Sequence, residues 1–372
     1  WTTTVERVVT VLVIACPHAL GLAIPLVVAI STTLGARNGL LVRDRRGLEE
    51  ARQLDLVVFD KTGTLTLAEH RVVDSATDGS IAPDEALRLA AAAERDSEHP
   101  VARALGLAAE KRDIALPAAS AFSATPGHGV QASVEGRAVE VGGPALLAAA
   151  GLEVPDALRA AAERNAEAGR SVVFLVEDRA VRALFAVADA VRPGSRDAIE
   201  LLHEAGIESA MLTGDSRAVA DAVAAELGID TVLAEVLPKD KAAEIERLQR
   251  DGKRVAMVGD GVNDAPALVT ADVGIAIGAG TQVAVEAGDV VLVRSDPRAV
   301  AAVVSLSRAT YRKMLQNLAW AAGYNVVAIP LAAGVLASQG IVLSPAVGAV
   351  LMSASTVIVA LNAQLLRRWR AA

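Results

Sequence analysis

The stretch Asp60-Lys61-Thr62-Gly63-Thr64-Leu65-Thr66 decides how the rest of the chain is interpreted. It follows the apolar residues 56–59, whose pattern is typical of a buried β-strand. A carboxylate at the end of such a strand, followed by a turn rich in glycine and hydroxyl side chains, can be presented as a nucleophile to a phosphoryl group. The sequence therefore predicts that Asp60 is a nucleophile.

Further apolar segments follow, separated by helical patterns. The predicted strands cover 209–212, 254–258, 273–277 and 290–293, and two predicted helices, 196–205 and 218–227, are closed by Gly206 and Gly228. Strands that alternate with helices indicate a parallel sheet with its chemistry at the carboxyl ends of the strands. Roughly 120 residues separate the first two strands, which is too many for a loop. We therefore expect an inserted domain at 67–188.

The inserted domain has a mixed pattern of helices and strands. Helices are predicted at 84–95, 100–112 and 155–168, and strands at 129–134, 138–141, 172–176 and 182–187. The domain is therefore expected to be of the α+β class, in contrast to the α/β domain that surrounds it in sequence.

Polar residues at the ends of the later strands complete the predicted site. Thr213-Gly214-Asp215 offers a hydroxyl and backbone N–H groups to a phosphate, and Lys241 offers a cation for the charge that develops during transfer. Asp260 and Asp264 follow the strand at 254–258 and place two carboxylates where Mg²⁺ would sit. Singly, such residues are often helix caps or turns. Their common position after predicted strands favours phosphoryl transfer.

Charge is distributed unevenly along the chain. The 372 residues carry a net charge of -8, with 53% hydrophobic and 22% charged residues, yet windows 8–30, 318–338 and 341–364 contain no charge. Each window has the length needed to cross a bilayer. Basic residues flank the windows on the side expected to be cytoplasmic, namely Arg37, Arg43, Arg45, Arg46, Arg308, Arg312, Lys313, Arg367, Arg368 and Arg370. We expect three membrane helices with residues 31–317 in the cytoplasm; three buried helices of a soluble core are the alternative.

These motifs resemble the phosphorylation domain of P-type ATPases, which carry the sequence of residues 60–66, 213–215 and 259–268. The resemblance implies that ATP phosphorylates Asp60, and that Mg²⁺ is bound by Asp60 and Asp264 with Asp260 close by. It also implies that Thr213 and Lys241 contact the phosphate. Lys61, Thr62, Gly214 and Asp215 complete the expected catalytic set, with Thr62 also at the Mg²⁺.

The implied fold is α/β, with a Rossmann-like phosphorylation domain of the haloacid dehalogenase type, an inserted α+β nucleotide-binding domain and three transmembrane helices. The expected boundaries are 1–54 for the first membrane helix and its extension, 55–66 with 189–298 for the phosphorylation domain, 67–188 for the nucleotide-binding domain and 299–372 for two more membrane helices.

Ser97-Glu98-His99-Pro100 resembles the nucleotide-binding signature of the heavy-metal-transporting branch of this family. A histidine can pack against a purine and hydrogen-bond to it, and glycines let the backbone approach the ligand. The expected ATP contacts are Glu94, His99, Pro100, Gly127, Gly129 and Gly142. Gly143 departs from the family pattern, which usually has Asn after the glycine at 142.

The first membrane window contains Cys16-Pro17-His18. Pro17 interrupts helical hydrogen bonding, and a thiol and an imidazole at bilayer depth suit soft or borderline ions such as copper, silver or zinc. Tyr324 and Asn325 in the second window, and Met352 and Ser353 in the third, are further candidate ligands, although each is equally ordinary in helix packing. Together these segments resemble the transport sites of copper-group pumps. Cu(I), Cu(II) and Ag(I) all remain open.

The resulting hypothesis is ATP-driven export of copper or silver through an aspartyl phosphate at Asp60. The partners expected are a lipid bilayer, with a bacterial cell membrane as the expected location, the metal ion and a metallochaperone that delivers it. An isoelectric point near 5.3 argues against a nucleic-acid partner. A membrane-anchored phosphatase of the haloacid dehalogenase superfamily is the alternative, and Thr62 opposes it because such phosphatases carry a second Asp at that position. The chain has no Thr-Gly-Glu, so we expect the actuator domain to lie outside it, and a chain that only binds ATP remains a third possibility.

Overall fold

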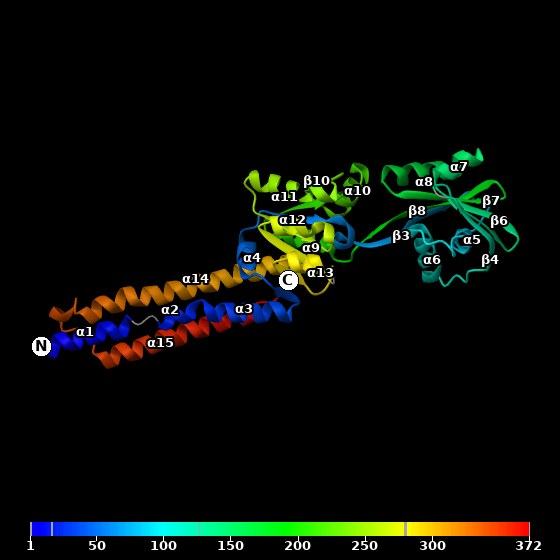
Figure 1. The fold of residues 1–372 in the computed structure, drawn as a ribbon. Helices are drawn as coiled ribbons and strands as arrows, with labels where there is room; N and C mark the ends of the chain where they lie inside the picture. Colours follow the sequence, from blue (N-terminus) through cyan, green and yellow to red (C-terminus); the bar gives the residue numbers. More distant parts are fainter. Residues whose placement is uncertain (1, 16–17, 126, 279–280, 372) are drawn as a thin grey trace. The chain divides into compact units, whose positions relative to one another are not determined.

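The computed structural model describes residues 2–15, 18–125, 127–278 and 281–371, and its strands form two sheets (Figure 1). The seven-stranded sheet has the order β1 (Leu40–Val42), β13 (Val290–Leu292), β12 (Val273–Ile277), β11 (Val255–Gly259), β2 (Leu56–Asp60), β9 (Glu208–Leu212) and β10 (Thr231–Leu233). Strands β9 with β10, β11 with β12 and β12 with β13 pair in parallel, as predicted. The additional strand β1 pairs antiparallel with β13.

Every residue of β2, β11 and β12 is buried, which explains why these strands appear as continuous apolar runs in the sequence. The helices of this part of the chain are α4 (Arg45–Glu50), α9 (Ser195–Glu204), α10 (Arg217–Leu227), α11 (Lys241–Arg250), α12 (Ala265–Thr270) and α13 (Gln282–Ala287). Gly206 and Gly228 have φ of +73° and +78°, so both predicted helix ends are correct.

The six-stranded sheet has the order β3 (Thr66–Thr77), β8 (Ala180–Val191), β7 (Ser171–Glu177), β6 (Arg137–Gly142), β5 (Gly129–Val134) and β4 (Ala119–Thr125), and all of its pairs are antiparallel. Its helices are α5 (Pro83–Ala93), α6 (Pro100–Lys111), α7 (Pro144–Ala150) and α8 (Asp156–Glu167). One apolar cluster joins α5 and α6 to the sheet, and a second joins α7 and α8 to it. This arrangement agrees with the predicted α+β class.

Strand β3 was not predicted from the sequence. Its middle is exposed and polar, and its pairing with β8 is irregular between Thr66 and His70, where Ala68 has a φ of +54°. A strand without alternating burial has no period-2 pattern to detect. Because β3 and β8 extend to residues 66 and 191, they run past the predicted insertion boundaries of 67 and 188, which remain a prediction.

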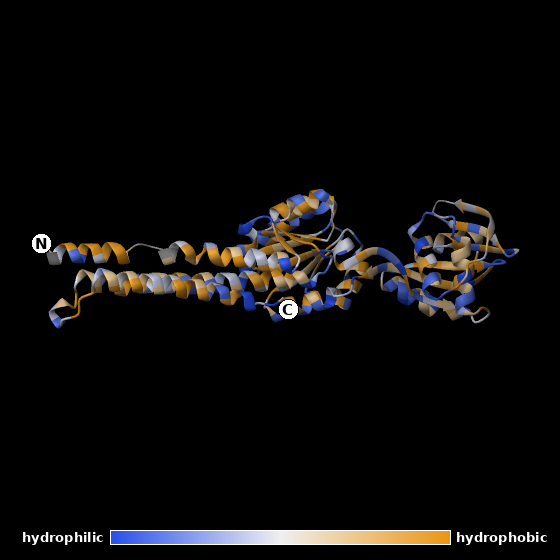
Figure 2. Cartoon of the chain, turned by 90° about the horizontal axis from the view of Figure 1, so that it is seen from below, coloured by the Kyte–Doolittle hydropathy of each residue, from blue (hydrophilic) through white to orange (hydrophobic). Residues whose placement is uncertain are grey.

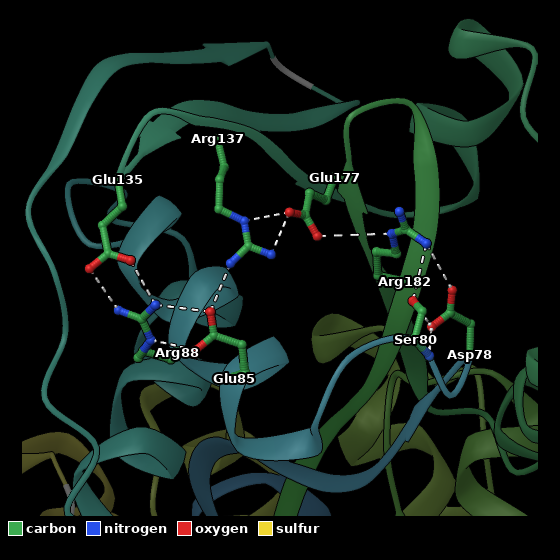
Figure 3. A network of polar contacts seen from close by, with 8 residues as sticks. All are labelled: Asp78, Ser80, Glu85, Arg88, Glu135, Arg137, Glu177 and Arg182. Atoms are coloured by element: carbon green, nitrogen blue, oxygen red, sulfur yellow. Dashed lines mark hydrogen bonds and ion pairs between the residues drawn. The ribbon is translucent and has the colours of Figure 1, made fainter.

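A network of ion pairs runs across one end of the six-stranded sheet, from the residues that follow β3 to the turn between β5 and β6 (Figure 3). Arg88 bonds to Glu85 and Glu135, Arg137 bonds to Glu85 and Glu177, and Arg182 reaches Glu177, Asp78 and Ser80. The pKa of Glu85 is lowered, chiefly by its hydrogen bonds from Arg88. The network ties α5 to one end of the sheet, at the turn between β5 and β6 and the turn between β7 and β8.

A bundle of apolar helices contains both ends of the chain and is largely orange in Figure 2. Its members are α1 (Thr2–Ile14), α2 (His18–Ala23), α3 (Pro25–Arg37), α14 (Arg298–Ala333) and α15 (Pro345–Gln364), followed by a final turn at Leu365–Arg368. In the described part of the chain, only the segment Pro345–Arg368 is both long enough and apolar enough to cross a membrane as one helix.

Of the three predicted membrane helices, the described residues therefore show one that meets the length and composition needed to cross a membrane. The window 8–30 is divided among α1, which ends at Ile14, α2, which begins at His18, and α3, which begins at Pro25. Cys16 and Pro17 lie outside the described residues. The window from 318 belongs to the 36-residue helix α14. The first half of this helix carries charges, and Trp320, Tyr324 and Asn325 lower the mean hydropathy of its second half.

Candidate active site

Asp60 is the last residue of β2, which lies between β11 and β9 in the centre of the seven-stranded sheet. The residue is 6% exposed, and the ammonium group of Lys241, at the start of α11, donates to its Oδ1. One carboxylate oxygen from each of Asp60, Asp260 and Asp264 lies within 4.8 Å of the others. The structure thus brings together the predicted nucleophile, the predicted cation and both predicted Mg²⁺ ligands.

Glycines around β11 allow this approach. A Cβ atom on Gly259 would lie 2.7 Å from Cβ and 2.8 Å from Oδ2 of Asp264, so no larger residue fits there. The backbone N–H of Gly261 donates to Asp264 Oδ2 at 3.1 Å and orients this carboxylate. Asp264 itself is buried. The local sequence therefore positions Asp264 through backbone geometry.

The loop after Asp60 turns at Gly63, which has a φ of +78°. Arg192, just after β8, donates from Nη2 to the carbonyl of Gly63 at 2.5 Å and from Nε to that of Thr64 at 2.9 Å, with a longer bond of 3.2 Å to Thr66. Ser195 donates to the Leu65 carbonyl at 2.9 Å. Sequence reasoning missed Arg192 and Ser195, because contacts to backbone carbonyls over such long sequence separations leave no motif.

Lys61 is buried and pairs with acids rather than with Asp60. Its Nζ lies 2.5 Å from Asp215 Oδ2 and 3.9 Å from Asp189 Oδ2. Thr213 donates its hydroxyl to Asp215 Oδ2 at 3.0 Å, and Thr66 donates to Asp189. The predicted residues Lys61 and Thr213 are therefore both bonded to Asp215, the third predicted residue. Asp189, which was not predicted, belongs to the same group.

The remaining predicted residues of this loop region differ in exposure. Thr62 is exposed, whereas its neighbours Lys61 and Gly63 are buried. Gly214 lies in the turn after β9, where a Cβ atom would approach the carbonyl oxygen of Val236 to 3.4 Å. No measurement here tests the chemical roles of Thr62 or Gly214, which stay predictions.

The predicted nucleotide residues lie in the domain of the six-stranded sheet. Glu94 follows α5 and is 4% exposed, and burial raises its pKa, partly offset by a hydrogen bond from Ser97 and the charge of His99. Its Oε2 has no hydrogen-bond partner among the described residues. His99 is exposed and caps α6, accepting at Nδ1 from the Val101 N–H at 3.3 Å, and Pro100 begins that helix.

Two of the predicted nucleotide-site glycines have a packing role. A Cβ atom on Gly129 would lie 2.1 Å from the Val141 carbonyl oxygen, and one on Gly142 would lie 2.0 Å from the His128 carbonyl oxygen. These glycines let β5 and β6 approach closely. Gly127 has a φ of +78° with open space around it. Of the three, Gly127 is the exposed one with open space around it.

The part of α15 that carries predicted cargo residues lies alongside the end of α1 and the start of α2. A Cβ atom on Gly348 of α15 would lie 3.0 Å from Ile14 Cγ1, and Val359 of α15 packs with Ala19, so the residues between them on α15 lie at this level. Tyr324 packs against the cluster that contains Ile14. Cys16 lies outside the described residues, and of His18 only the backbone, at the start of α2, is described.

Within the third window the structure distinguishes two serines. Ser353 is exposed in this chain and donates to the Ala349 carbonyl at 2.9 Å, whereas Ser355 is buried. The Ser355 hydroxyl has no hydrogen-bond partner in the described residues. Met352 and Asn325 are half-buried. Helical geometry therefore places Ser355, rather than the predicted Ser353, toward the neighbouring helices.

Comparison with known proteins gives a consistent result. The family model for haloacid dehalogenase-like hydrolases matches residues 54–272. The chain belongs to this family. It is 56% identical to copper-exporting P-type ATPase B of Archaeoglobus fulgidus over 98% of its own length and 52% of the relative. It is 50% identical to the probable copper-exporting P-type ATPase V of Mycobacterium tuberculosis over 97% of its length and 46% of that protein.

Solved structures agree with this assignment within the haloacid dehalogenase-like family. A zinc-transporting PIB-type ATPase in the E2.Pi state matches 95% of this chain and 57% of its own, with a TM-score of 0.85 and 34% identity. The catalytic domain of a CPx-ATPase, studied for its changes on nucleotide binding, matches with a TM-score of 0.53 and 26% identity over 73% of this chain and 97% of that domain. The predicted resemblance to metal-transporting P-type ATPases is confirmed. The chain spans about half the length of the curated relatives.

Proposed function

We propose that this chain supplies the phosphorylation site, the ATP site and part of the cargo path of an ATP-driven exporter of copper-group ions. The observation that carries the proposal is the buried Asp60 carboxylate, with the Lys241 ammonium bonded to it and Asp260 and Asp264 within 4.8 Å. The similarity to copper-exporting P-type ATPases over nearly the whole chain supports the same assignment.

In the proposed reaction, an oxygen of Asp60 forms a bond to the γ-phosphorus of ATP while the bond from that phosphorus to the bridging oxygen of ADP breaks. Lys241 offers positive charge beside the Asp60 carboxylate, close to where the oxygens of the transferred phosphoryl group would carry negative charge. The three carboxylates are the hard oxygen ligands that Mg²⁺ prefers, so Asp60, Asp260 and Asp264 would hold it. When bound, Mg²⁺ would supply charge neutralisation for the phosphate oxygens.

Thr62 explains why the phosphoenzyme would persist. A carboxylate at this position would act as a base for water, and threonine has no such capacity at neutral pH. A stable aspartyl phosphate suits a transporter that couples its later breakdown to movement of an ion. A phosphatase would gain nothing from it.

We assign the adenine end of ATP to the surroundings of Glu94, His99, Pro100 and Gly127. The unpartnered Oε2 of Glu94 is an acceptor for an exocyclic amino group, and the exposed His99 ring is available for stacking. Gly129 and Gly142 act indirectly in this proposal, by keeping β5 and β6 close together beneath Gly127.

The cargo would cross the membrane through the helix bundle, with α1 to α3, α14 and α15 forming three spans and residues 31–317 in the cytoplasm. Cys16 and His18 are the proposed central ligands, and Tyr324, Asn325, Met352 and Ser353 the additional candidates, joined now by Ser355. Sulfur and imidazole ligands favour copper or silver. Delivery of the ion by a metallochaperone remains a prediction.

The test is metal-dependent phosphorylation of the protein in lipid vesicles with radiolabelled ATP and Mg²⁺. We expect acid-stable label that rises with Cu(I), Ag(I) or Cu(II), and no label in Asp60→Asn. Label that survives Asp60→Asn would overturn the assignment of the nucleophile. Rapid turnover of small phosphomonoesters without any metal-ion stimulation would instead favour the membrane-anchored phosphatase.

A further inference from the structure

A line of amide side chains connects three helices of the bundle. Asn317 of α14 is fully buried, and its Nδ2 donates to the backbone carbonyl of Ala23 at 3.2 Å. Asn362 of α15 donates to Asn317 Oδ1 at 2.7 Å, and Lys313 donates to Asn362 Oδ1 at 2.9 Å. None of these side chains belongs to the phosphorylation, nucleotide or cargo sites described above.

The acceptor at the end of this line is a carbonyl at the C-terminus of a helix. Ala23 is the last residue of the six-residue helix α2, and α3 begins as a separate helix at Pro25, so the Ala23 carbonyl is one of the terminal carbonyls that have no donor within their own helix. A helix end inside an apolar bundle needs a donor from elsewhere, because an unpaired backbone carbonyl is costly there. Asn317 supplies that donor.

Helix α2 has only six residues, and α3 begins as a separate helix at Pro25, so few backbone hydrogen bonds fix the position of α2. His18, a proposed cargo ligand, is its first residue, and Ala23 is its last. Ala19 and Ala23 also pack against Ala321 and Val359, which are small or branched residues without polar groups. Packing of this kind leaves rotation and sliding of α2 weakly specified, whereas a directional hydrogen bond specifies both.

The bonds have a defined direction. An asparagine that donates to a carbonyl must turn its Oδ1 the other way, and Asn362 Nδ2 fills that acceptor position. The Asn362 Oδ1 in turn accepts from the Lys313 ammonium, which also bonds to Gln316 at 3.0 Å. Each amide is therefore held in one orientation by the next, and the orientation of Asn317 does not depend on the cargo.

We propose that Asn317 is a positioning residue for the cargo site: through the Ala23 carbonyl it fixes helix α2, and so His18, against α14 and α15, with Asn362 holding it in register. This inference rests on the proposed function and deepens it. It assigns to Asn317 no contact with the metal, and it concerns the affinity for the cargo alone, because the line of bonds ends at α2.

The experiment uses the protein in lipid vesicles and Ag(I) as the probe ion. Phosphorylation of Asp60 by ATP is measured against Ag(I) concentration at saturating ATP, and against ATP concentration at saturating Ag(I). Asn317→Asp is nearly isosteric and keeps an acceptor for Asn362, but it replaces the donor to Ala23 by a carboxylate oxygen. We expect the half-saturating Ag(I) concentration to rise about tenfold or more, since the Ala23 carbonyl then faces an acceptor. The half-saturating ATP concentration should change less than about twofold.

Asn362→Ala provides a milder second variant, because it leaves the Asn317 donor in place but frees its orientation. We expect an increase of about threefold in half-saturating Ag(I), in line with one hydrogen bond between membrane helices. Gln364→Ala, at an exposed amide on the same helix, is the matched control and should leave both curves unchanged. If Asn317→Asp does not fold, Asn362→Ala still decides the question.

Three results would overturn the inference: wild-type Ag(I) dependence in both Asn317→Asp and Asn362→Ala, equal shifts in the Ag(I) and ATP curves, or the same shift in Gln364→Ala. These outcomes differ from failure of the proposed function, in which the wild-type protein itself would show no Ag(I)-dependent label at Asp60.

Discussion

Replacing Arg192 by glutamine tests how the loop that follows Asp60 is held. The guanidinium group donates to the carbonyls of Gly63, Thr64 and Thr66 at 2.5, 2.9 and 3.2 Å. A hydrogen bond from a charged donor contributes about 1.5–3 kcal/mol. Arg192 is half-buried, so water would replace part of what is lost, and we expect a destabilisation of about 3 kcal/mol. Displacement of the loop by about 1 Å would slow phosphorylation of Asp60 roughly 100-fold.

Thermal unfolding followed by circular dichroism measures the first effect, and the initial rate of labelling from ATP measures the second. Arg192→Lys keeps the charge but cannot reach three carbonyls with a rigid fork, so it should fall between wild type and Arg192→Gln. Arg196→Gln removes an exposed arginine paired with Glu200 only four residues away and should be close to wild type. If Arg192→Gln matched Arg196→Gln in both assays, the loop would not depend on these bonds.

Three further predictions concern other parts of the chain. Thr62→Asp should accelerate hydrolysis of the phosphoenzyme by about 10²-fold or more by adding a base, which a chase with unlabelled ATP measures as faster loss of label. Burial raises the pKa of Glu94 above its ordinary value of 4.5, because the folded state favours the protonated, uncharged carboxyl. The contribution of Glu94 to stability is therefore fully present below pH 4.5 and is lost as pH rises through the raised pKa. Glu94→Gln should accordingly increase Tm more at pH 8 than at pH 4.5 in calorimetry, while weakening ATP binding. Glu177→Gln leaves Arg137 and Arg182 without their shared anion and should lower stability by about 1 kcal/mol, whereas Arg159→Gln, in an exposed pair with Asp156, should not change Tm measurably.

The chemistry at the strand ends was predictable because the seven-stranded sheet is buried on both faces. Its strands appear as apolar runs, and each polar residue directly after a run must lie at the same edge of a parallel sheet. This reasoning found Asp60, Asp260 and Asp264 correctly as neighbours. It had no means of finding Asp189, because that residue lies within a long strand of the other sheet and meets Lys61 only through tertiary structure.

Predictions within the helix bundle were less complete for a different reason. Helical spacing indicates which residues share a face, but it does not say which face meets a neighbour. Ser353 and Ser355 differ by two positions, so they point to different sides of α15, and only the packing of Gly348 and Val359 against other helices shows that Ser355 is the buried one. The line through Asn317 was hidden for the same reason.

The charges around Asp60 explain why phosphorylation should depend on a divalent cation. Asp60, Asp260 and Asp264 bring three negative charges within 4.8 Å, and Lys241 brings one positive charge. Lys61 adds nothing to this balance because it is paired with Asp215 and Asp189. These four groups therefore carry a net charge of about −2, which would repel the γ-phosphate of ATP. One Mg²⁺ ion would balance the charge of these four groups, so a bound divalent cation would let the γ-phosphate approach Asp60.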